Sequence, residues 1–133
     1  MHDPIKRLAT DDTTEVLRPL VSLISKSEKA LQKLTPGTWQ HSMLRDNLKA
    51  LHIASILMSN RTDPSDRWTR DDLQESLQAL ASMIGKTEKA KARFSPGTSQ
   101  HTLLRNRLKS LRLAQQLIQT RADSPGDSEG KRL

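Results

Sequence analysis

The amino-acid sequence predicts an all-α protein: a four-helix up-down-up-down bundle made of two tandem-duplicated helical hairpins. The first observation is the composition, because 34% of the 133 residues are hydrophobic and only 2% are aromatic, which suits helices better than strands. The second is an internal repeat, since residues 11–60 and 71–120 align without a gap and are identical at roughly half of their positions. The third is a helical spacing of apolar residues in both copies.

The chain length predicts one compact domain, because 133 residues can bury one core but not two independent ones. The linker and the tail are rich in polar residues and lack apolar periodicity. We therefore expect a flexible N-terminus over 1–10, hairpin 1 over 11–60, a linker over 61–68, hairpin 2 over 69–120 and a disordered tail over 121–133.

Each hairpin is expected to contain two amphipathic helices of about 20 residues, or about 30 Å. The first arm of hairpin 1 carries apolar or small residues every three or four positions: Leu17, Leu20, Leu23, Ile24, Ser27, Ala30, Leu31 and Leu34. The matching arm of hairpin 2 carries Leu77, Leu80, Met83, Ile84, Thr87, Ala90 and Phe94. The second arms carry Leu44, Leu48, Leu51, Ala54, Leu57 and Met58, and Leu104, Leu108, Leu111, Ala114, Leu117 and Ile118. These spacings give every helix one apolar face.

Signals for helix starts support this division. Thr69 followed by Asp72 is typical of a capping box and predicts the start of the third helix. Pro19 would interrupt a helix that began at Asp12. We therefore expect the first helix to start nearer Thr14 or to kink at the proline.

Small residues in the third helix allow two interpretations. Ala81 and Gly85, with Val21 and Ser25 at the matching positions of hairpin 1, could permit a close helix crossing. Alternatively, Gly85 could only weaken an exposed helical turn by about 1 kcal/mol. The sequence leaves both interpretations open.

The stretches TPGTWQH at 35–41 and SPGTSQH at 95–101 join the arms of the two hairpins. Thr35 could cap the following helix, with a proline in its first turn. Alternatively, Gly37 could take a left-handed conformation and Thr38 could provide the cap. In a bundle both turns would lie at the same end, where two helix N-termini could attract an anion.

The same Gln-His pair follows both turns. One hypothesis gives this pair a capping or packing role. The other places it in a binding site, because an exposed first turn tolerates almost any polar residue and yet both hairpins have the same pair. A polar stripe continues from each histidine at four-residue steps along one helix face. The pair is Gln40 and His41 in hairpin 1, and its stripe continues through Arg45 and Lys49. In hairpin 2 the pair is Gln100 and His101, and its stripe continues through Arg105 and Lys109.

Opposite charges are expected to meet across each hairpin. Folding hairpin 1 about Gly37 brings residue 28 roughly opposite residue 46. Glu28 should then reach Arg45 or Lys49 of the neighbouring helix. Glu88 of hairpin 2 should likewise reach Arg105 or Lys109. Four nearby lysines leave these clusters positively charged: Lys26, Lys29, Lys86 and Lys89.

The net charge of +7 is concentrated in hairpin 2, since residues 71–120 carry +4 and residues 11–60 carry +1. Leu31, Asp46, Asn47 and His52 of hairpin 1 are replaced by Lys91, Asn106, Arg107 and Arg112. Solvation of a helix surface could explain some of these changes, and a basic binding surface could explain all of them. The candidate binding residues are Lys86, Lys89, Lys91, Arg105, Arg107, Lys109, Arg112, Gln40, His41, Gln100 and His101.

The sequence contains no pattern typical of an enzyme. Paired carboxylates, a Gly-rich phosphate loop, an HExxH motif and a nucleophile with an evident base are all missing. The lack of cysteine excludes disulfides and thiolate chemistry. His41 and His101 could meet at one end of a bundle as a metal pair, but no acidic ligand has a comparable placement. We therefore expect no catalysis, no cofactor and no metal.

These observations favour a non-enzymatic binding or scaffold module that contacts an acidic protein partner through the basic face of hairpin 2. Weak, sequence-independent nucleic-acid binding through the same face is an alternative, although Trp39 is replaced by Ser99 and a symmetric aromatic platform is therefore missing. Homo-oligomerisation through a leftover apolar strip is a further alternative. An apolar N-terminal segment and a run of roughly 18 apolar residues are both missing, which predicts a cytoplasmic protein without a membrane partner.

Overall fold

Four helices make up the part of the chain that the structure describes, as the sequence predicts. The computed structural model describes residues 4–59 and 68–123, and in the first of these ranges it describes side chains from Glu15 onward. The helices are α1 (Pro4–Gln32), α2 (Trp39–Ser59), α3 (Arg70–Lys91) and α4 (Ser99–Ala122). The all-α class is therefore confirmed.

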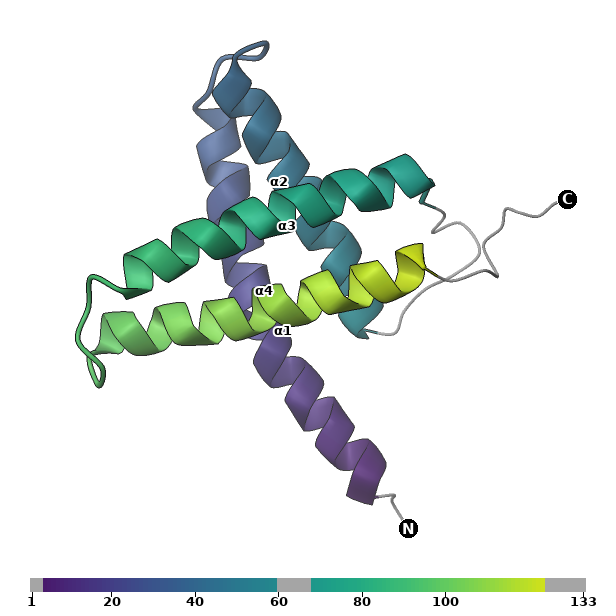
Figure 1. The fold of residues 1–133 in the computed structure, drawn as a ribbon, viewed down its shortest axis with the longest axis vertical. Coiled ribbons are helices and arrows are strands. Elements are labelled where there is room, and N and C mark those ends of the chain that lie inside the picture. Colours follow the sequence, from purple (N-terminus) through teal and green to yellow (C-terminus); the bar gives the residue numbers. More distant parts are fainter. Residues whose placement is uncertain (1–3, 60–67, 124–133) are drawn as a thin grey trace, which may run out of the picture.

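The helices pair into two antiparallel hairpins that cross. Hairpin 1 consists of α1 and α2, hairpin 2 consists of α3 and α4, and hairpin 2 lies across hairpin 1 (Figure 1). α2 packs against both helices of hairpin 2, and α1 packs against α4. Over the described ranges, no Cα atom of α1 lies within 8 Å of a Cα atom of α3. The four packed helices are consistent with up-down connectivity.

The two hairpin turns lie at separate ends of the molecule (Figure 1). The prediction that both turns share one end is therefore wrong. Because the hairpins cross instead of running alongside each other, each turn forms the tip of its own hairpin. The N-termini of α2 and α4 consequently form no common anion site, and His41 and His101 do not meet.

α1 is longer than the sequence predicts. It begins at Pro4 and contains Pro19, so of the two alternatives the late start near Thr14 is wrong, and the kink at the proline stays a prediction. A proline is compatible with the first position of a helix, which explains the early start. Pro19 lacks the N–H that would donate to the Glu15 carbonyl, yet the helix continues on both sides of it. Residues 4–10, expected to be flexible, belong to α1.

Leu, Ile, Ala and Met side chains from all four helices form the core. Leu20 and Leu80 occupy matching positions of the repeat, as do Leu51 and Leu111, and all four are fully buried. Burial of one such side chain contributes about 1.5–3 kcal/mol. The core cluster is Leu20, Ala50, Leu51, Ile53, Ala54, Met58, Leu73, Leu80, Leu111, Ala114 and Ile118. Ala50, Ile53 and Leu73 were not predicted to be core residues. The two from α2 are buried because that helix packs against three neighbours.

The capping box at the start of α3 is confirmed. The Asp72 backbone N–H donates to Thr69 Oγ1, and the Thr69 backbone N–H donates to Asp72 Oδ2, both at 2.9 Å. Two backbone donors at the helix start are thereby satisfied. At the same end of hairpin 2, the Arg121 guanidinium of α4 lies 5.2 Å from the centroid of the Trp68 ring, just before α3.

Gly85 does not mark a close helix crossing. A Cβ atom built on Gly85 would have no neighbour within 4 Å. Ala81 and Val21, the other residues of this hypothesis, are both exposed. The structure therefore supports the interpretation that Gly85 only lowers the intrinsic stability of α3.

The predicted linker, 61–68, and the predicted disordered tail, 121–133, lie largely outside the described residues. Residues 61–67 of the linker and 124–133 of the tail are not described. The remaining part of the predicted tail is ordered, because α4 extends to Ala122. Among the described helices, none combines the length and the apolar content needed to span a membrane.

Candidate functional site

The repeated PGT stretch forms the same turn in both hairpins. Gly37 and Gly97 both have φ near 94°, a left-handed conformation that glycine adopts without steric cost. The Thr38 and Thr98 hydroxyls each accept a hydrogen bond from the backbone N–H three residues later, at 3.2 Å. Each hydroxyl also donates to a carbonyl of the turn, at 2.9 and 2.8 Å. Of the two capping schemes, the one based on Thr38 is therefore correct.

The repeated Gln-His pair has a backbone role in these caps. The capped N–H groups belong to His41 and His101. Their imidazole groups make no hydrogen bond or ion pair within the described part of the chain. Gln40 and Gln100 are exposed at the tips of different hairpins. The structure thus explains the position of the pair but does not bring the two copies together.

Both hairpins place the predicted glutamate against a basic side chain of the neighbouring helix, but with partners other than those predicted. Glu28 lies 3.8 Å from His52 Nε2, and Glu88 forms a salt bridge with Arg112. These pairs occupy matching positions of the repeat. The predicted register was wrong, because the side chains opposite Glu28 and Glu88 are six positions beyond residues 46 and 106.

Lys49 binds to the other hairpin instead of to Glu28. Its ammonium lies 2.5 Å from Asp72 and 3.7 Å from Glu75 of α3. The hydrogen bond from Lys49 lowers the pKa of Asp72, and the same bond raises the pKa of Lys49. The positive charge of Lys49 is thus largely neutralised within the protein.

The charge of hairpin 2 is more unbalanced. Between residues 86 and 112 there are eight Lys and Arg residues and one acidic residue, Glu88. Glu88 is already bound to Arg112. The matching stretch of hairpin 1, residues 26–52, has five Lys and Arg residues and two acidic residues, and acids of α3 bind one of those lysines. The excess positive charge therefore belongs to hairpin 2.

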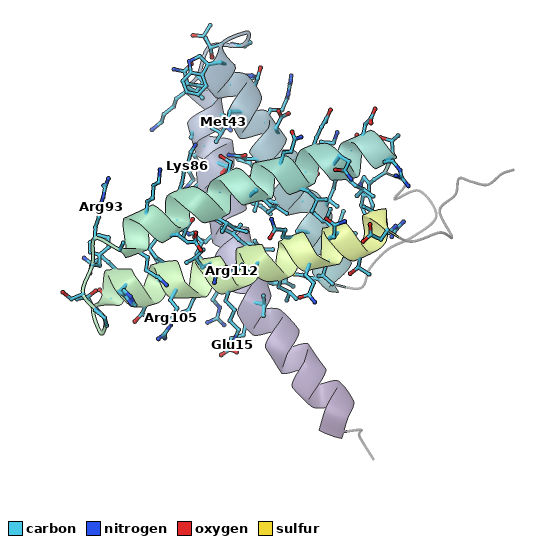
Figure 2. All side chains as sticks on the ribbon, in the orientation of Figure 1. Glu15, Met43, Lys86, Arg93, Arg105 and Arg112 are labelled. Carbon is cyan, nitrogen blue, oxygen red and sulfur yellow. The ribbon has the colours of Figure 1, made fainter. Side chains whose placement is uncertain are left out.

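The basic residues of hairpin 2 lie along two edges, as Figure 2 shows for Lys86 and Arg93 on the α3 side and for Arg105 on the α4 side. Spacings of three and four residues place the helical members of each set on one side of their helix, and Arg93 lies in the turn that follows α3. We call Lys86, Lys89 and Arg93 the α3 strip, and Arg105, Lys109 and Arg112 the α4 strip. All six residues are exposed. Arg93 was absent from the predicted set. Its counterpart in hairpin 1 is Lys33, so both hairpins have a cation at this position.

Lys91 and Arg107 differ from the strips because they are half-buried. Burial lowers the pKa of Arg107. Within the described ranges, the Arg107 guanidinium makes no ion pair or hydrogen bond. A half-buried cation without an anion is unfavourable in the free protein, so Arg107 is a stronger candidate for an external anion than the fully solvated lysines are.

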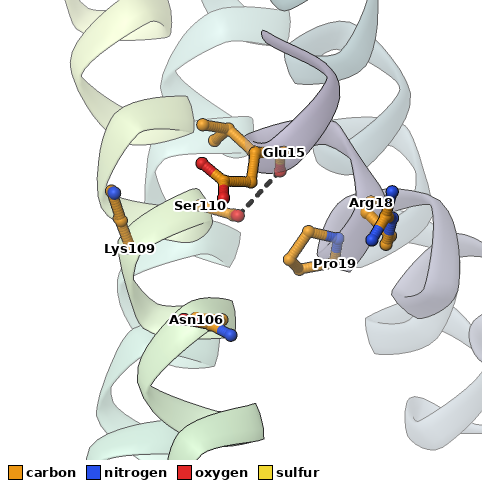
Figure 3. Close-up of a pocket in the computed structure, with 7 residues that line it drawn as sticks. Glu15, Arg18, Pro19, Asn106, Lys109 and Ser110 are labelled. Atoms are coloured by element: carbon orange, nitrogen blue, oxygen red, sulfur yellow. Dashed lines mark hydrogen bonds between the residues drawn. The ribbon is translucent and has the colours of Figure 1, made fainter. Parts of the chain in front are cut away.

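A pocket of about 250 Å³ lies between α1 and α4 (Figure 3). Beside it, the buried Ser110 hydroxyl of α4 donates to the Val16 carbonyl of α1 at 2.7 Å. Of the predicted binding residues, only Lys109 contributes to this pocket. The lining consists of Glu15, Val16, Arg18, Pro19, Asn106, Lys109 and Ser110. Sequence reasoning missed the pocket because it depends on the crossing of the two hairpins.

Large apolar side chains are exposed near the hairpin tips. Trp39 is 69% exposed at the start of α2, Phe94 is 38% exposed in the second turn, and Leu103 is 53% exposed in α4. Trp39 stands on the hairpin with the weaker charge excess. It is therefore not placed to stack with a base bound to either strip.

Comparisons with protein-family models, curated proteins and solved structures gave no match to this chain. Among the described side chains, no group of three or more His, Asp or Glu residues could hold a metal ion. The candidate site is therefore defined by its own chemistry, which is a clustered positive charge with a small polar pocket next to it.

Proposed function

We propose that the chain is a non-enzymatic binding module that recognises an acidic protein through the basic surface of hairpin 2. The observation that supports this most is the charge between residues 86 and 112, where eight cations surround one acidic residue that is already paired. Exposed charges act over about 8 Å at physiological salt. A clustered excess of this kind attracts an acidic surface, and scattered charges do not.

The second part of the proposal is that the two hairpins are copies of one ancestral hairpin. The equal turn conformations, the matched contacts of Glu28 with His52 and of Glu88 with Arg112, and the matched buried leucines support it. After duplication, hairpin 2 gained cations at the positions of Leu31, Asn47 and His52. Recognition should therefore depend on hairpin 2 more than on hairpin 1.

Exchanging residues between the hairpins tests this function. The loss variant carries Lys91→Leu, Arg107→Asn and Arg112→His, which are the residues of hairpin 1. The matched variant carries Leu31→Lys, Asn47→Arg and His52→Arg. Every substitution introduces a residue that the other hairpin already accommodates at the same position, so both variants should fold.

The measurement is fluorescence anisotropy with a labelled short poly-glutamate peptide. The loss variant should bind the peptide about tenfold more weakly than the original protein, and the matched variant should bind within about threefold of it. Equal binding by all three proteins would contradict a role for hairpin 2. A duplex DNA of similar charge is measured in parallel at two salt concentrations. Tighter binding of the DNA at physiological salt would assign the surface to nucleic acid instead.

A further inference from the structure

The pocket between α1 and α4 lies at the crossing that corresponds, in the repeat, to the crossing of α2 and α3. By the repeat, its α4 residues Lys109 and Asn106 match Lys49 and Asp46 of α2. Lys49 is bound by Asp72 and Glu75 where α2 crosses α3. Lys109 has no ion pair with any described side chain, although it lines the pocket. At the equivalent crossing, Lys109 lines an open pocket together with Glu15, which matches Glu75. Asp12, which matches Asp72, lies outside the side chains that the structure describes.

Two sequence differences between the hairpins accompany the open space. Pro19 lines the pocket at the position where α3 has Ala79. Asn106 occupies the position where α2 has Asp46, so the pocket has an amide in place of a carboxylate. The first change removes a backbone donor from α1, and the second removes a negative charge from the lining. The loss of the carboxylate favours an incoming anion, whereas the missing N–H of Pro19 leaves the Glu15 carbonyl without its helical donor.

We propose that this pocket receives one carboxylate side chain of the acidic partner, an inference that rests on the proposed function. The Lys109 ammonium and the Asn106 amide can donate to the carboxylate oxygens, and Arg18 adds a second positive charge. Glu15, the remaining charged residue of the lining, lies beside Ser110 (Figure 3). It can accept a hydrogen bond from a backbone N–H next to the bound carboxylate. With two cations and one anion, the lining favours a group of negative charge.

The size and position of the pocket favour a side chain of a partner over a free small molecule. Sites for free ligands usually have volumes of about 300–1,000 Å³ and a mostly apolar lining. This pocket is smaller, and five of its seven lining residues are polar or charged. Lys109 also belongs to the α4 strip. A partner held by that strip would therefore present its carboxylate at a high effective concentration.

Two variants with the same change in net charge test this inference. Asn106→Asp places a carboxylate in the pocket, within reach of Lys109 one helical turn away. Gln116→Glu, the control, adds the same charge at an exposed position of α4, about 15 Å further along the helix. Both are measured with the labelled poly-glutamate peptide, after circular dichroism has shown that each variant is folded.

Asn106→Asp should weaken peptide binding about tenfold and Gln116→Glu less than about twofold. In an NMR titration of the original protein with the same peptide, the Asn106 side-chain amide should shift. Equal weakening by the two variants, or an unshifted Asn106 amide in a protein that still binds, would overturn the pocket while leaving the proposed function intact. Failure of the original protein to bind the peptide even at low salt would overturn both.

Discussion

The Lys49 ammonium of α2 lies 2.5 Å from the Asp72 carboxylate of α3, and this ion pair joins the two hairpins where they cross. The same carboxylate accepts the Thr69 backbone N–H in the capping box. One side chain therefore starts a helix and fixes that helix to its neighbour. This double role makes Asp72 the polar residue whose loss should affect the fold most.

The first prediction concerns the stability that Asp72 provides. Asp72→Ala should lower the free energy of unfolding by about 1–2 kcal/mol, because it removes half of a capping box and a charged hydrogen bond. Asp71→Ala is the control, since Asp71 precedes it in the same helical turn but makes no side-chain contact among the described residues. It should cost less than about 1 kcal/mol, through the helix dipole alone. Urea denaturation measures both, and equal losses would contradict a special role for Asp72.

The second prediction is a pH dependence. The pKa of Asp72 is lower in the folded protein, chiefly because of the hydrogen bond from Lys49, so protonation favours the unfolded chain. This contribution to stability is complete above the unfolded pKa of about 4 and is lost as the pH falls through the folded pKa. Asp72→Asn should therefore lower stability at pH 7, and the difference from the original protein should shrink in acid.

Thermal denaturation of both proteins from neutral to acidic pH checks this prediction. The raised pKa of Lys49 has the opposite effect on the pH dependence of stability. Its contribution is complete below the unfolded pKa of about 10.4 and is lost as the pH rises through the folded pKa. The difference between the two proteins should therefore be constant between these limits. A difference that grew in acid would contradict the Lys49 to Asp72 assignment.

The third prediction compares two glycines. Gly85 lies inside α3 with open space at its Cβ position, so Gly85→Ala should raise the free energy of unfolding by about 0.5–1 kcal/mol. Gly97 also has open space, but its φ is 94°. Gly97→Ala should therefore destabilise by about 1–2 kcal/mol, through backbone strain alone. Opposite signs in chemical denaturation would support both assignments, whereas a destabilising Gly85→Ala would restore the close-crossing hypothesis.

The sequence was sufficient to predict the helices because its signals are local. Apolar residues at three- and four-residue spacings located the helix faces, and the Thr69 to Asp72 spacing located the start of α3. Leu20 and Leu80 are buried, as predicted. Local signals also identified the turn chemistry of Gly37, although the choice between Thr35 and Thr38 as the cap required the structure.

The hairpin crossing could not be predicted, because it depends on contacts between residues that are distant in the sequence. Ion pairs illustrate this limit. Glu28 was expected to meet Arg45 or Lys49. Instead, Lys49 binds Asp72 of the other hairpin and Glu28 faces His52. The pocket between α1 and α4 has the same origin. Charge counting indicated that hairpin 2 is basic, but it could not show that the charges lie on two edges or that Arg107 is half-buried.

The last prediction is that Arg107 lowers stability while it supports binding. Its guanidinium is half-buried without an anion among the described residues, and burial lowers its pKa, so the charged form is disfavoured in the free protein. Arg107→Asn introduces the residue of hairpin 1 and should raise the free energy of unfolding, by up to about 1 kcal/mol. The same variant should bind the poly-glutamate peptide more weakly, because a desolvated arginine binds a carboxylate more strongly than a solvated one.

Arg105→Asn is the exposed control and should change stability by less than about 0.5 kcal/mol. Urea denaturation and peptide anisotropy on both variants decide the matter, and an Arg107→Asn protein that is less stable than the original would show that the guanidinium has a structural role instead.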